Sequence, residues 1–385
     1  MNNVNKYSIF LILALVFLLF SWSIHKPPFF ELNPKNVISN PSGLSPFWDY
    51  IKLHSDQEIS IFHIGDSHIE MGYITNEIKK RLSEKFGKGI DGWQFPYQLF
   101  NPQSETYFAM KEKGDWKKST IKQKKDSVLL GVNGQAFYTK DSSANLTFTN
   151  SMRFGILHSV SFLHFTTSSV FFQVEEASIH SEQISKNTSI TTITADTPGK
   201  NIRIHFSGSI VPIYAIRINH SNKKGISYHN LGVSGSTLIE FTTHTQLFLE
   251  QVKSLKPNLL IVSLGTNDSY RSSLDFEKDY VKIVSFFTEI RTVCPSTAIL
   301  FTTAPDTKYK NMHPSKLALV NKMIKKAAEE TGSSCWDLFH IMGGENSIEI
   351  WEKQGLVNKD RLHFTPKGYR NQGALLSTAL LKTKH

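Results

Sequence analysis

Residues 58–68, EISIFHIGDSH, decide the fold, because they join a predicted buried strand to a short polar turn. The apolar run EISIFHI has the length and composition of a strand, and it stops at Gly65. A helix is predicted over residues 74–86, where apolar side chains recur every four residues: Ile74, Ile78, Leu82 and Phe86. A strand followed by an amphipathic helix is typical of the α/β class.

The same alternation of strand and helix returns from residue 225 to the end of the chain. The predicted strands are ISYHNLG (226–232), LLIVSLG (259–265), AILFTTAP (298–305) and CWDLF (335–339), and the predicted helices are 238–255, 276–293, 315–331 and one after Pro366. Such alternation predicts a parallel sheet covered by helices. Because one strand and one helix cannot bury both of their faces alone, we assign residues 47–102 and 220–385 to one α/β domain.

A different texture separates these two parts. Residues 103–219 are rich in Ser and Thr and contain short alternating segments such as ANLTFTN, SVSFLHFTT, TSITTIT and NIRIHFS. This pattern predicts the strands of an antiparallel sandwich or jelly roll. The predicted fold class is therefore α/β, a three-layer sandwich with a central parallel sheet, interrupted by an inserted all-β domain.

The amino-terminal residues 1–26 stand apart from this fold. Residues 7–24 (YSIFLILALVFLLFSWSI) carry no charge, and as a helix they just reach across a hydrocarbon core of about 30 Å. No small-residue cleavage site follows, which favours an uncleaved signal anchor over a removed signal peptide. We expect a single-pass anchor in the inner or plasma membrane, a linker over residues 27–46, and the remainder of the chain on the periplasmic or extracytoplasmic side.

Composition narrows the class of protein. Of the 385 residues, 40% are hydrophobic and 20% are charged, which excludes a disordered or collagen-like chain. The net charge of +10 suits an anionic partner. Two cysteines, Cys294 and Cys335, are too few for a disulfide scaffold or a cysteine-rich zinc site. In an exported protein they either pair with each other or remain as two buried thiols.

Polar residues close the predicted strands of the α/β part. They lie in four segments: 65–68 (GDSH), 230–235 (NLGVSG), 265–268 (GTND) and 360–363 (DRLH). In this order they resemble the four blocks of the SGNH (GDSL-type) hydrolase family, which are a GDS segment, a glycine, a GxND segment and a DxxH pair. The resemblance spans Gly65 to His363 and leaves the β insertion and the anchor outside. It implies an SGNH-type three-layer sandwich and a serine esterase.

The chemistry of these residue types supports the same interpretation. A serine hydroxyl is a weak nucleophile that needs an adjacent base and a third group to orient the base, and Ser67, His363 and Asp360 supply the three. For the oxyanion formed on attack we expect the backbone N–H groups of Ser67 and Gly235 as donors. The family resemblance adds the side-chain amide of Asn267. We expect no cofactor and no metal, because the remaining histidines show no ligand spacing.

Other interpretations of the same segments stay open. Gly232 competes with Gly235 for the oxyanion position. The segment GVSGS (232–236) nearly matches the GxSxG elbow of α/β-hydrolases, with Ser234 as nucleophile, but its fifth residue is serine. The segment GKGIDG (87–92) matches the dinucleotide pattern GxGxxG, but it follows a predicted helix and opens none, so we predict a loop.

Three polar residues beside the predicted site have a structural interpretation. Asp66 and Asp268 flank predicted site residues, and we predict that they cap helices or brace loops. His68 stands where the family has leucine, and we predict a structural role for it rather than contact with substrate.

Lysines crowd residues 111–125 (KEKGDWKKSTIKQKK). The first interpretation is a solvated loop, and the second is contact with an anionic polymer. Trp116 is the only aromatic residue of this segment, so it offers no stacking ladder for nucleic acid, and we expect no nucleic-acid partner.

The anchor and the insertion together suggest where such an enzyme works. A retained anchor and an inserted β domain resemble the membrane-anchored peptidoglycan O-acetylesterases, in which the insertion looks like a carbohydrate-binding module. The expected function is hydrolysis of O-acyl esters, above all O-acetyl esters, on a cell-envelope glycan such as peptidoglycan. The alternatives are a glycan O-acetyltransferase that uses the same residues, a lipase or thioesterase, and a non-catalytic glycan-binding scaffold.

Overall fold

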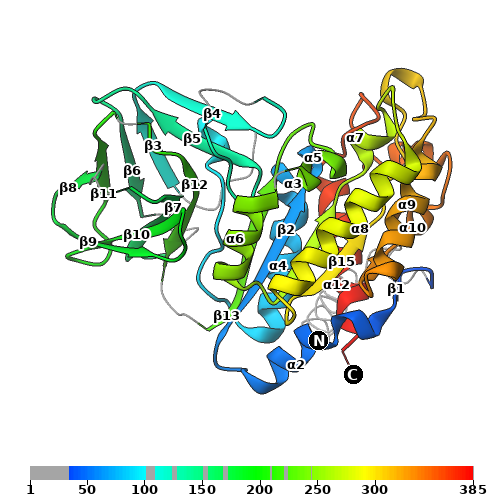
Figure 1. Cartoon of the computed structure of the whole chain (residues 1–385), viewed down its shortest axis with the longest axis horizontal. Coiled ribbons are helices and arrows are strands. Elements are labelled where there is room, and N and C mark those ends of the chain that lie inside the picture. Colours follow the sequence, from blue (N-terminus) through cyan, green and yellow to red (C-terminus); the bar gives the residue numbers. More distant parts are fainter. Residues whose placement is uncertain are drawn as a thin grey trace, which may run out of the picture.

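The computed structural model describes residues 34–100, 109–123, 128–150, 155–167, 172–208, 210–220, 224–243 and 245–384. An α/β unit and a β-rich unit lie side by side (Figure 1). None of the helices in the described residues is long and apolar enough to cross a membrane. The predicted anchor, residues 7–24, lies outside the described residues.

The α/β unit is built on a six-stranded sheet. Its strands, in spatial order, are β1 (Ile38–Ser39), β16 (Ser334–Trp336), β15 (Ala298–Thr302), β14 (Leu259–Ser263), β2 (Glu58–Gly65) and β13 (Gly225–Gly232). All pairs are parallel except the edge pair of β1 with β16. Strand β2 precedes the insertion yet pairs with both β13 and β14, so chain segments from both sides of the insertion build one sheet.

Helices cover both faces of this sheet because side chains alternate along β2. One group of helices is α2 (Ser45–Leu53), α4 (Tyr73–Phe86) and α12 (Pro366–Lys382), and the other is α5 (Leu238–Thr242), α6 (Thr245–Leu255), α8 (Phe276–Val293) and α9 (Leu317–Glu330) (Figure 1). Ile59 and Ile61 of β2 pack with the first group, whereas Phe62 and Ile64 pack with the second. This three-layer arrangement confirms the predicted fold class.

The single helix predicted over residues 238–255 is wrong, because the structure has two. Helix α5 ends at Thr242, and α6 begins at Thr245. The Thr242 and Thr243 hydroxyls donate to the carbonyls of Ile239 and Glu240, one turn back. Such bonds compete with the helical ladder.

The β-rich unit consists of two antiparallel sheets. One has the order β4 (Trp116–Thr120), β5 (Gln135–Thr139), β12 (Ile213–Asn219), β7 (Ser159–Phe165), β10 (Thr188–Ala195) and β9 (Ala177–Gln183). The other has the order β3 (Ala109–Lys113), β6 (Asn145–Thr149), β11 (Ile202–Phe206) and β8 (Phe172–Val174). Phe137, Phe148 and Phe162 share one apolar core, which includes residues of both sheets.

The lysine-rich segment is not the loop that its composition suggests. Its described part forms the end of β3 and all of β4, each at the edge of its sheet. Backbone pairing with β6 and β5 holds these strands, and lysines at a sheet edge discourage further strand addition. The solvated-loop interpretation is therefore wrong for residues 111–113 and 116–120.

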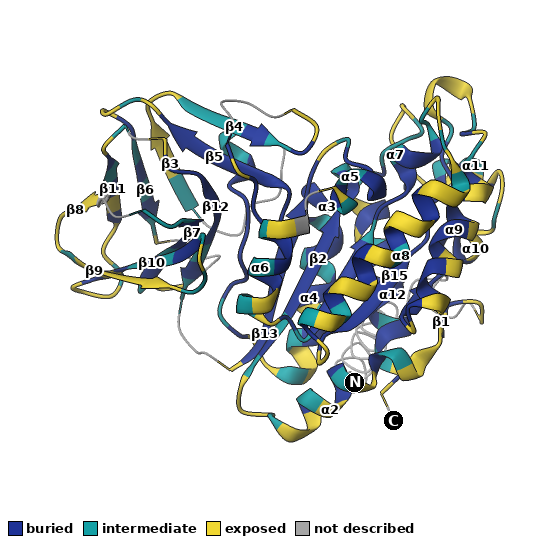
Figure 2. Ribbon diagram, viewed as in Figure 1, coloured by how far each residue is buried: buried dark blue, intermediate teal, exposed yellow. Residues whose placement is uncertain are grey.

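The two units share a continuous core. Tyr138 and Tyr214 of the β-rich unit belong to the same buried apolar cluster as Phe241 and Phe248 of helices α5 and α6. In Figure 2, strands of both units, such as β5 and β2, are coloured as buried. The backbone N–H of Val132 also donates to the side chain of Gln251 on α6. The β insertion is thus packed into the α/β unit and not tethered to it.

The GxGxxG-like segment 87–92 is a loop, as predicted. It runs beside β13, where Lys88 forms a parallel bridge with Ile226. A Cβ on Gly92 would lie 2.0 Å from the carbonyl oxygen of Tyr228. Close backbone approach, and not phosphate binding, accounts for this glycine.

Candidate active site

The carboxyl ends of β2, β13 and β14 meet at one edge of the sheet. Two short helices begin there, α3 (Ser67–Glu70) and α7 (Thr266–Ser269), together with α5 (Figure 1). Ser67 is the first residue of α3, and Asp66 caps that helix by accepting the backbone N–H of His68 at 3.0 Å. Four of the predicted site residues, Ser67, Gly235, Asn267 and His363, come to this edge from four separate segments.

Ser67, His363 and Asp360 form a continuous chain of contacts. The Ser67 Oγ lies 3.0 Å from His363 Nε2, and His363 Nδ1 lies 2.7 Å from Asp360 Oδ2. Since a carboxylate only accepts, the proton of the neutral imidazole belongs on Nδ1, which leaves Nε2 to accept the Ser67 hydroxyl. This is the geometry that activates a serine hydroxyl.

A tight turn holds the Asp360 to His363 segment in place. Asp360 Oδ1 accepts the backbone N–H groups of Leu362 and His363, both at 3.0 Å. Arg361 takes a left-handed conformation with φ of 52°, which costs about 1–3 kcal/mol for a residue with a side chain. Its guanidinium contacts the Glu352 carboxylate through Nε at 3.0 Å and Nη2 at 2.7 Å, which fastens the strained residue.

The pKa of Asp360 lies below its usual range. Partial burial alone would raise this pKa, but hydrogen bonds from His363 and from the backbone N–H groups of His363 and Leu362 lower it. Asp360 is therefore ionised at neutral pH, as an acid that orients a histidine must be.

Gly232 ends β13 and Gly235 lies in the loop that leads to α5, and the two glycines have different roles. The backbone N–H of Gly232 donates to Asn230 Oδ1, and that of Val233 donates to the Gly65 carbonyl. The N–H of Ser234 donates to Glu70 Oε2, and that of Ser236 donates to the Val233 carbonyl. The N–H of Gly235 has no acceptor among the described residues. A Cβ on Gly232 would lie 2.2 Å from the Glu70 nitrogen.

Gly235 is glycine for a conformational reason. It has a φ of 77° and precedes Ser236, whose N–H donates to Val233 at 3.1 Å, so the four residues make a turn with a left-handed third position. The unengaged N–H favours Gly235 over Gly232 as an oxyanion donor. The Ser67 N–H likewise has no acceptor among the described residues.

Asn267 reaches the site from α7, but its amide is already engaged. Its Nδ2 donates to the Ser236 carbonyl at 3.0 Å and to Asp66 Oδ2 at 3.3 Å. An amide nitrogen has two N–H groups, so a bound oxyanion must share one of them. The longer bond, to Asp66, is the weaker of the two.

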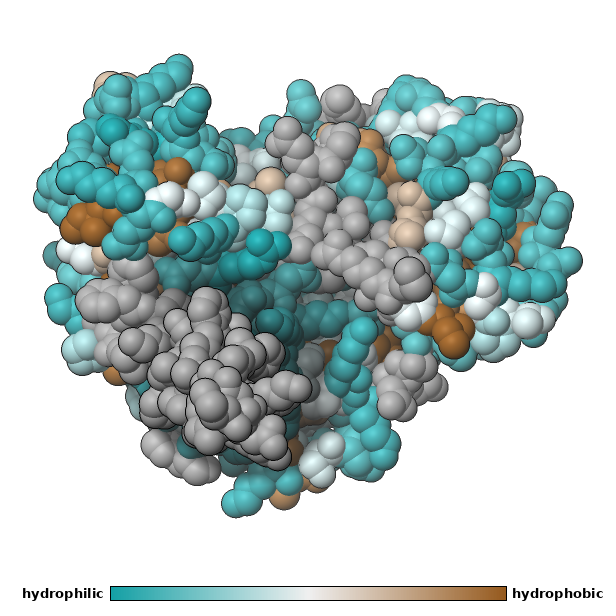
Figure 3. Space-filling view, turned by 180° about the vertical axis from the view of Figure 1, so that it is seen from behind, coloured by the Kyte–Doolittle hydropathy of each residue, from teal (hydrophilic) through white to brown (hydrophobic). Residues whose placement is uncertain are grey.

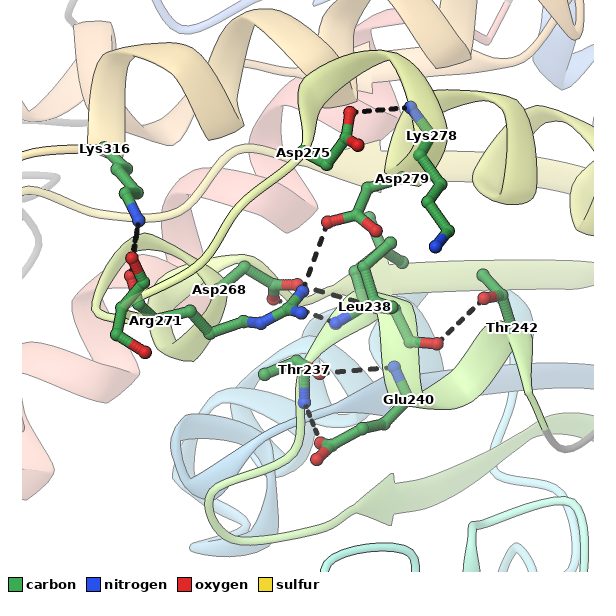
Figure 4. Close-up of polar contacts among 12 residues, drawn as sticks. Thr237, Leu238, Glu240, Thr242, Asp268, Arg271, Asp275, Lys278, Asp279 and Lys316 are labelled. Carbon is green, nitrogen blue, oxygen red and sulfur yellow. Dashed lines mark hydrogen bonds and ion pairs between the residues drawn. The ribbon is translucent and has the colours of Figure 1, made fainter.

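Asp268 braces the opposite side of the loop. Its carboxylate accepts the backbone N–H groups of Leu238 at 2.9 Å and Ile239 at 3.5 Å, at the start of α5 (Figure 4). Thr237 and Glu240 complete a capping box there. Burial raises the pKa of Asp268 to about 6, although these backbone N–H groups oppose the rise. The predicted bracing role of Asp268 is therefore confirmed.

Asp66 and His68 also have the structural contacts predicted for them. Asp66 is 1% exposed, and its burial raises its pKa to about 7 against the lowering effect of the His68 N–H. His68 Nδ1 lies 3.1 Å from the Tyr369 hydroxyl. Burial, with the nearby His363, lowers the pKa of His68 to about 3, so this ring is neutral beside His363.

Two residues near the site escape prediction from sequence. Glu70 Oε2 accepts the Ser234 N–H at 2.6 Å, which joins α3 to the glycine loop. Lys122 comes from the β insertion, lies 3.9 Å from the Cβ position of Gly235, and pairs with Glu240 Oε1 at 2.8 Å. Both contacts link residues more than one hundred positions apart, so no local pattern indicates them.

The site is open to solvent. The side chains of His363 and Asp360 are 33% and 38% exposed, and Ser67 is half-buried. The Ser234 hydroxyl contacts no histidine among the described residues, which disfavours it as a nucleophile.

Figure 3 shows the molecule from behind. The described residues on that face are mostly hydrophilic, with apolar side chains in small separate groups.

The described residues form neither a metal-binding cluster nor a disulfide. Among the described residues, no group of three or more His, Cys, Asp or Glu side chains is placed to hold a metal ion. Cys294 and Cys335 are both buried thiols, and they do not form a disulfide. The second of the two alternatives left open for these cysteines is therefore the one found.

Comparisons with known proteins find a family match over part of the chain. Residues 208–370 match the GDSL-like Lipase/Acylhydrolase family. The matched range includes Gly235, Asn267, Asp360 and His363, whereas Ser67 precedes it on the far side of the insertion. No curated protein matches the chain.

Solved structures extend the likeness to the insertion. A structure described as "Peptidoglycan O-acetylesterase in action, 5 min" is 23% identical with a TM-score of 0.68, covering 88% of this chain and 95% of its own. An acetylxylan esterase from Geobacillus stearothermophilus is 21% identical with a TM-score of 0.32, covering 42% and 73%. A lipase/acylhydrolase from Enterococcus faecalis is 16% identical with a TM-score of 0.32, covering 40% and 74%. Residues 208–370 of the α/β part therefore match a GDSL-like lipase/acylhydrolase domain, and the likeness to the first of these structures shows a shared fold over most of the chain.

Proposed function

We propose that the chain is an extracytoplasmic serine esterase that removes O-acetyl groups from a cell-envelope glycan such as peptidoglycan. The observation that carries the proposal is the contact chain from Ser67 through His363 to Asp360 on an open surface. An exposed reacting group suits an ester on a bulky polymer, because a polymer cannot enter an enclosed pocket.

In the proposed mechanism Ser67 is the nucleophile. Its Oγ attacks the acetyl carbonyl carbon while its proton passes to His363 Nε2. The tetrahedral intermediate collapses, the C–O bond to the sugar breaks, and the sugar oxygen takes that proton. Water then attacks the acetyl-serine, giving a proton to His363, and collapse returns this proton to Ser67 and releases acetate. Asp360 keeps the His363 ring oriented and stabilises its charged form.

The oxyanion is held by the donors at the strand ends. The N–H groups of Ser67 and Gly235 are unengaged among the described residues, and Asn267 shares an N–H by loosening its 3.3 Å bond to Asp66. Each donor of this kind is worth about 2.7–4 kcal/mol in the transition state.

The choice of substrate and location has separate support. The similar structure that covers 88% of this chain is a peptidoglycan O-acetylesterase, and its likeness includes the β insertion. The uncharged residues 7–24 support a membrane anchor and an active site outside the cytoplasm. We propose a single-pass protein of the inner or plasma membrane whose partners are this membrane and the acylated glycan.

Acetate release tests the proposal. Full-length protein should release acetate from O-acetylated cell wall, and a Ser67→Ala variant with unchanged thermal stability should not. An added acceptor sugar should leave the yield of acetate unchanged. Transfer of the acetyl group to that sugar would instead identify an O-acetyltransferase.

Two further outcomes would replace the proposal. A preference for long acyl chains over acetyl among chromogenic esters would favour a lipase or thioesterase. Failure of a fluorophosphonate to label the wild-type protein, with no ester hydrolysed, would leave a glycan-binding scaffold.

The location is tested by fractionation. The full-length chain should remain in the membrane, released by detergent but not by salt, since a hydrophobic anchor is insensitive to screening. A soluble mature chain that begins near residue 26 would contradict the anchor.

A further inference from the structure

A cleft lies at the end of the sheet that is opposite to the candidate active site. It encloses about 410 Å³, within the range of small-ligand sites. Its walls come from both units, because Arg217 belongs to β12 whereas Lys256 follows α6 and Tyr50 belongs to α2. In Figure 1, α2 and the start of β13 lie at this end, and α3, α5 and α7 lie at the other.

The cleft exists because α6 ends early. Glu58, Ser60 and Phe62 occupy alternate positions on the face of β2 that α6 covers further along. Helix α6 ends at Leu255, and the chain turns away at Lys256, which has a φ of 45°. The first residues of β2 on that face therefore border the cleft.

Cations outnumber carboxylates in the lining. Arg217 and Lys256 face a single carboxylate, Glu58, which Arg217 contacts through Nη2. Lys256 has no ion-pair partner among the described residues. The other titratable groups are uncharged at neutral pH, because burial lowers the pKa of His229 well below its usual value and raises that of Tyr50.

Several hydrogen-bond donors remain available to a ligand. Arg217 donates from Nε to the backbone carbonyl of Asp91 at 3.1 Å and from Nη2 to the Glu58 carboxylate and the Ser227 hydroxyl. Its Nη1 has no acceptor among the described residues. His229 accepts the Trp93 N–H at its Nδ1, so its Nε2–H donates to Ser60 Oγ at 3.0 Å. The Ser60 hydroxyl proton is therefore left to donate elsewhere.

We propose that this cleft is an accessory binding site for an acidic sugar unit, a monosaccharide that carries a carboxylate. The lining includes the buried aromatic side chains of Phe62 and Trp93, together with the hydrogen-bond donors and the excess positive charge. A sugar ring has apolar faces and many hydroxyls, which match these aromatic side chains and donors, and its carboxylate matches the two cations. A carboxylate ion alone would fill only a small part of the volume.

The site is remote from the chemistry. Strand β2 joins Glu58 in the cleft to Gly65 at the candidate active site, roughly 23 Å at about 3.3 Å per residue. A ligand in the cleft therefore does not touch Ser67. A polymer held there would raise the local concentration of its own acetyl groups at the catalytic end. This role in capturing polymer rests on the proposed function, whereas sugar binding itself does not.

Binding can be measured without catalysis. Wild-type protein is titrated with glucuronic acid and with glucose, two sugars that differ at the carboxylate, and ligand-observed NMR reports the dissociation constants. Lys256→Gln removes one cation, and Ser296→Trp fills the cleft from its exposed rim. Lys253→Gln is the matched control, because Lys253 is an exposed lysine of α6 outside the cleft.

The expected results separate the site from nonspecific charge. Glucuronic acid should bind wild-type and Lys253→Gln protein alike, about fivefold more weakly to Lys256→Gln, and not measurably to Ser296→Trp. Glucose should bind more weakly than glucuronic acid to the wild type. Equal binding of the two sugars, no binding to the wild type, or wild-type affinity in Lys256→Gln and Ser296→Trp would overturn the proposal.

Activity then distinguishes this inference from the proposed function. Lys256→Gln should turn over a small acetate ester at the wild-type rate and show a lower kcat/KM on an acetylated acidic glycan. If wild-type protein released no acetate from any glycan, the proposed function would be wrong. The sugar titration would still show whether the cleft binds an acidic sugar.

Discussion

The chain contains two Asp-x-x-His segments, and they differ in one contact. Asp337 and His340 repeat the spacing of Asp360 and His363, and in both pairs the histidine Nδ1 lies 2.7 Å from the aspartate Oδ2. His363 Nε2 also meets the Ser67 hydroxyl at 3.0 Å. The His340 side chain is 58% exposed and contacts no serine among the described residues.

The two aspartates also have different surroundings. Asp337 caps α10 (Leu338–Met342), accepts the Thr303 hydroxyl at 3.0 Å and pairs with Lys325 at 3.1 Å. Asp360 caps no helix, and its second oxygen is used on the turn that aims His363. A local Asp-x-x-His motif therefore produces a histidine–aspartate pair, whereas the sheet topology decides which of the two histidines contacts the nucleophilic serine.

The largest expected effect separates the two histidines. His363→Ala should lower kcat for a small acetate ester by about 10⁴–10⁶, because no base remains to accept the Ser67 proton. His340→Ala should stay within about twofold of the wild type. Steady-state kinetics measures kcat of both variants, and circular dichroism establishes that they are folded. Comparable losses of kcat in the two variants would contradict the different roles of His363 and His340.

The aspartates should differ almost as much. Asp360→Asn should lower kcat by about 10⁴, because an amide can stabilise the wrong tautomer of His363. Asp337→Asn should leave kcat unchanged, since its histidine serves no nucleophile. Full activity in Asp360→Asn would show that His363 needs no orienting acid.

Asn267→Ala should have a smaller effect that appears in kcat. The oxyanion forms only on attack, so kcat should fall by about 10²–10³ with little change in KM. Asp268→Asn at the adjacent position is a control. Because Asp268 braces α5, this substitution should lower stability more than kcat. A change confined to KM in Asn267→Ala would make Asn267 a substrate-binding residue instead.

The smallest expected effect is a difference in acid stability. Burial would raise the pKa of Asp337, but Lys325 and Thr303 lower it below its usual 3.8. A lowered pKa stabilises the fold above about pH 4, and this contribution disappears as the pH falls through the lowered value. Asp337→Asn should cost up to about 1 kcal/mol at pH 7 and progressively less in acid. Urea unfolding of both proteins between pH 7 and pH 3 measures this, and a constant difference would contradict it.

How far the fold follows from the sequence depends on the range of the interactions. The helix over Phe276–Val293 and the strand that begins at Glu58 are local patterns, and the structure has both. Strand β4 was not predicted, because its lysines suggest a solvated loop and the backbone pairing with β5 that forms the strand is not local in the sequence. The break between α5 and α6 depends on two threonine hydroxyls, which a hydrophobic pattern does not register.

The candidate site divides in the same way. Ser67 and Asn267 stand in motifs that follow strands, and Asp360 and His363 stand in a motif in the turn before α12, so the sequence identifies all four. The structure brings Ser67, Asp360 and His363 into contact. Glu70 and Lys122 have no motif, because their roles depend on a loop that is distant in the sequence. The sequence left Gly232 and Gly235 competing, and the hydrogen bonds of their N–H groups are what separate them.

The residue that reacts with a fluorophosphonate decides whether Ser67 is the nucleophile. Full-length protein is labelled with a fluorophosphonate, digested and analysed by tandem mass spectrometry. We predict a single adduct on Ser67, absent from Ser67→Ala and undiminished in His340→Ala. An adduct on Ser234 would contradict it, because the nucleophile would then lie in the GVSGS loop and the His363–Asp360 pair would not serve Ser67.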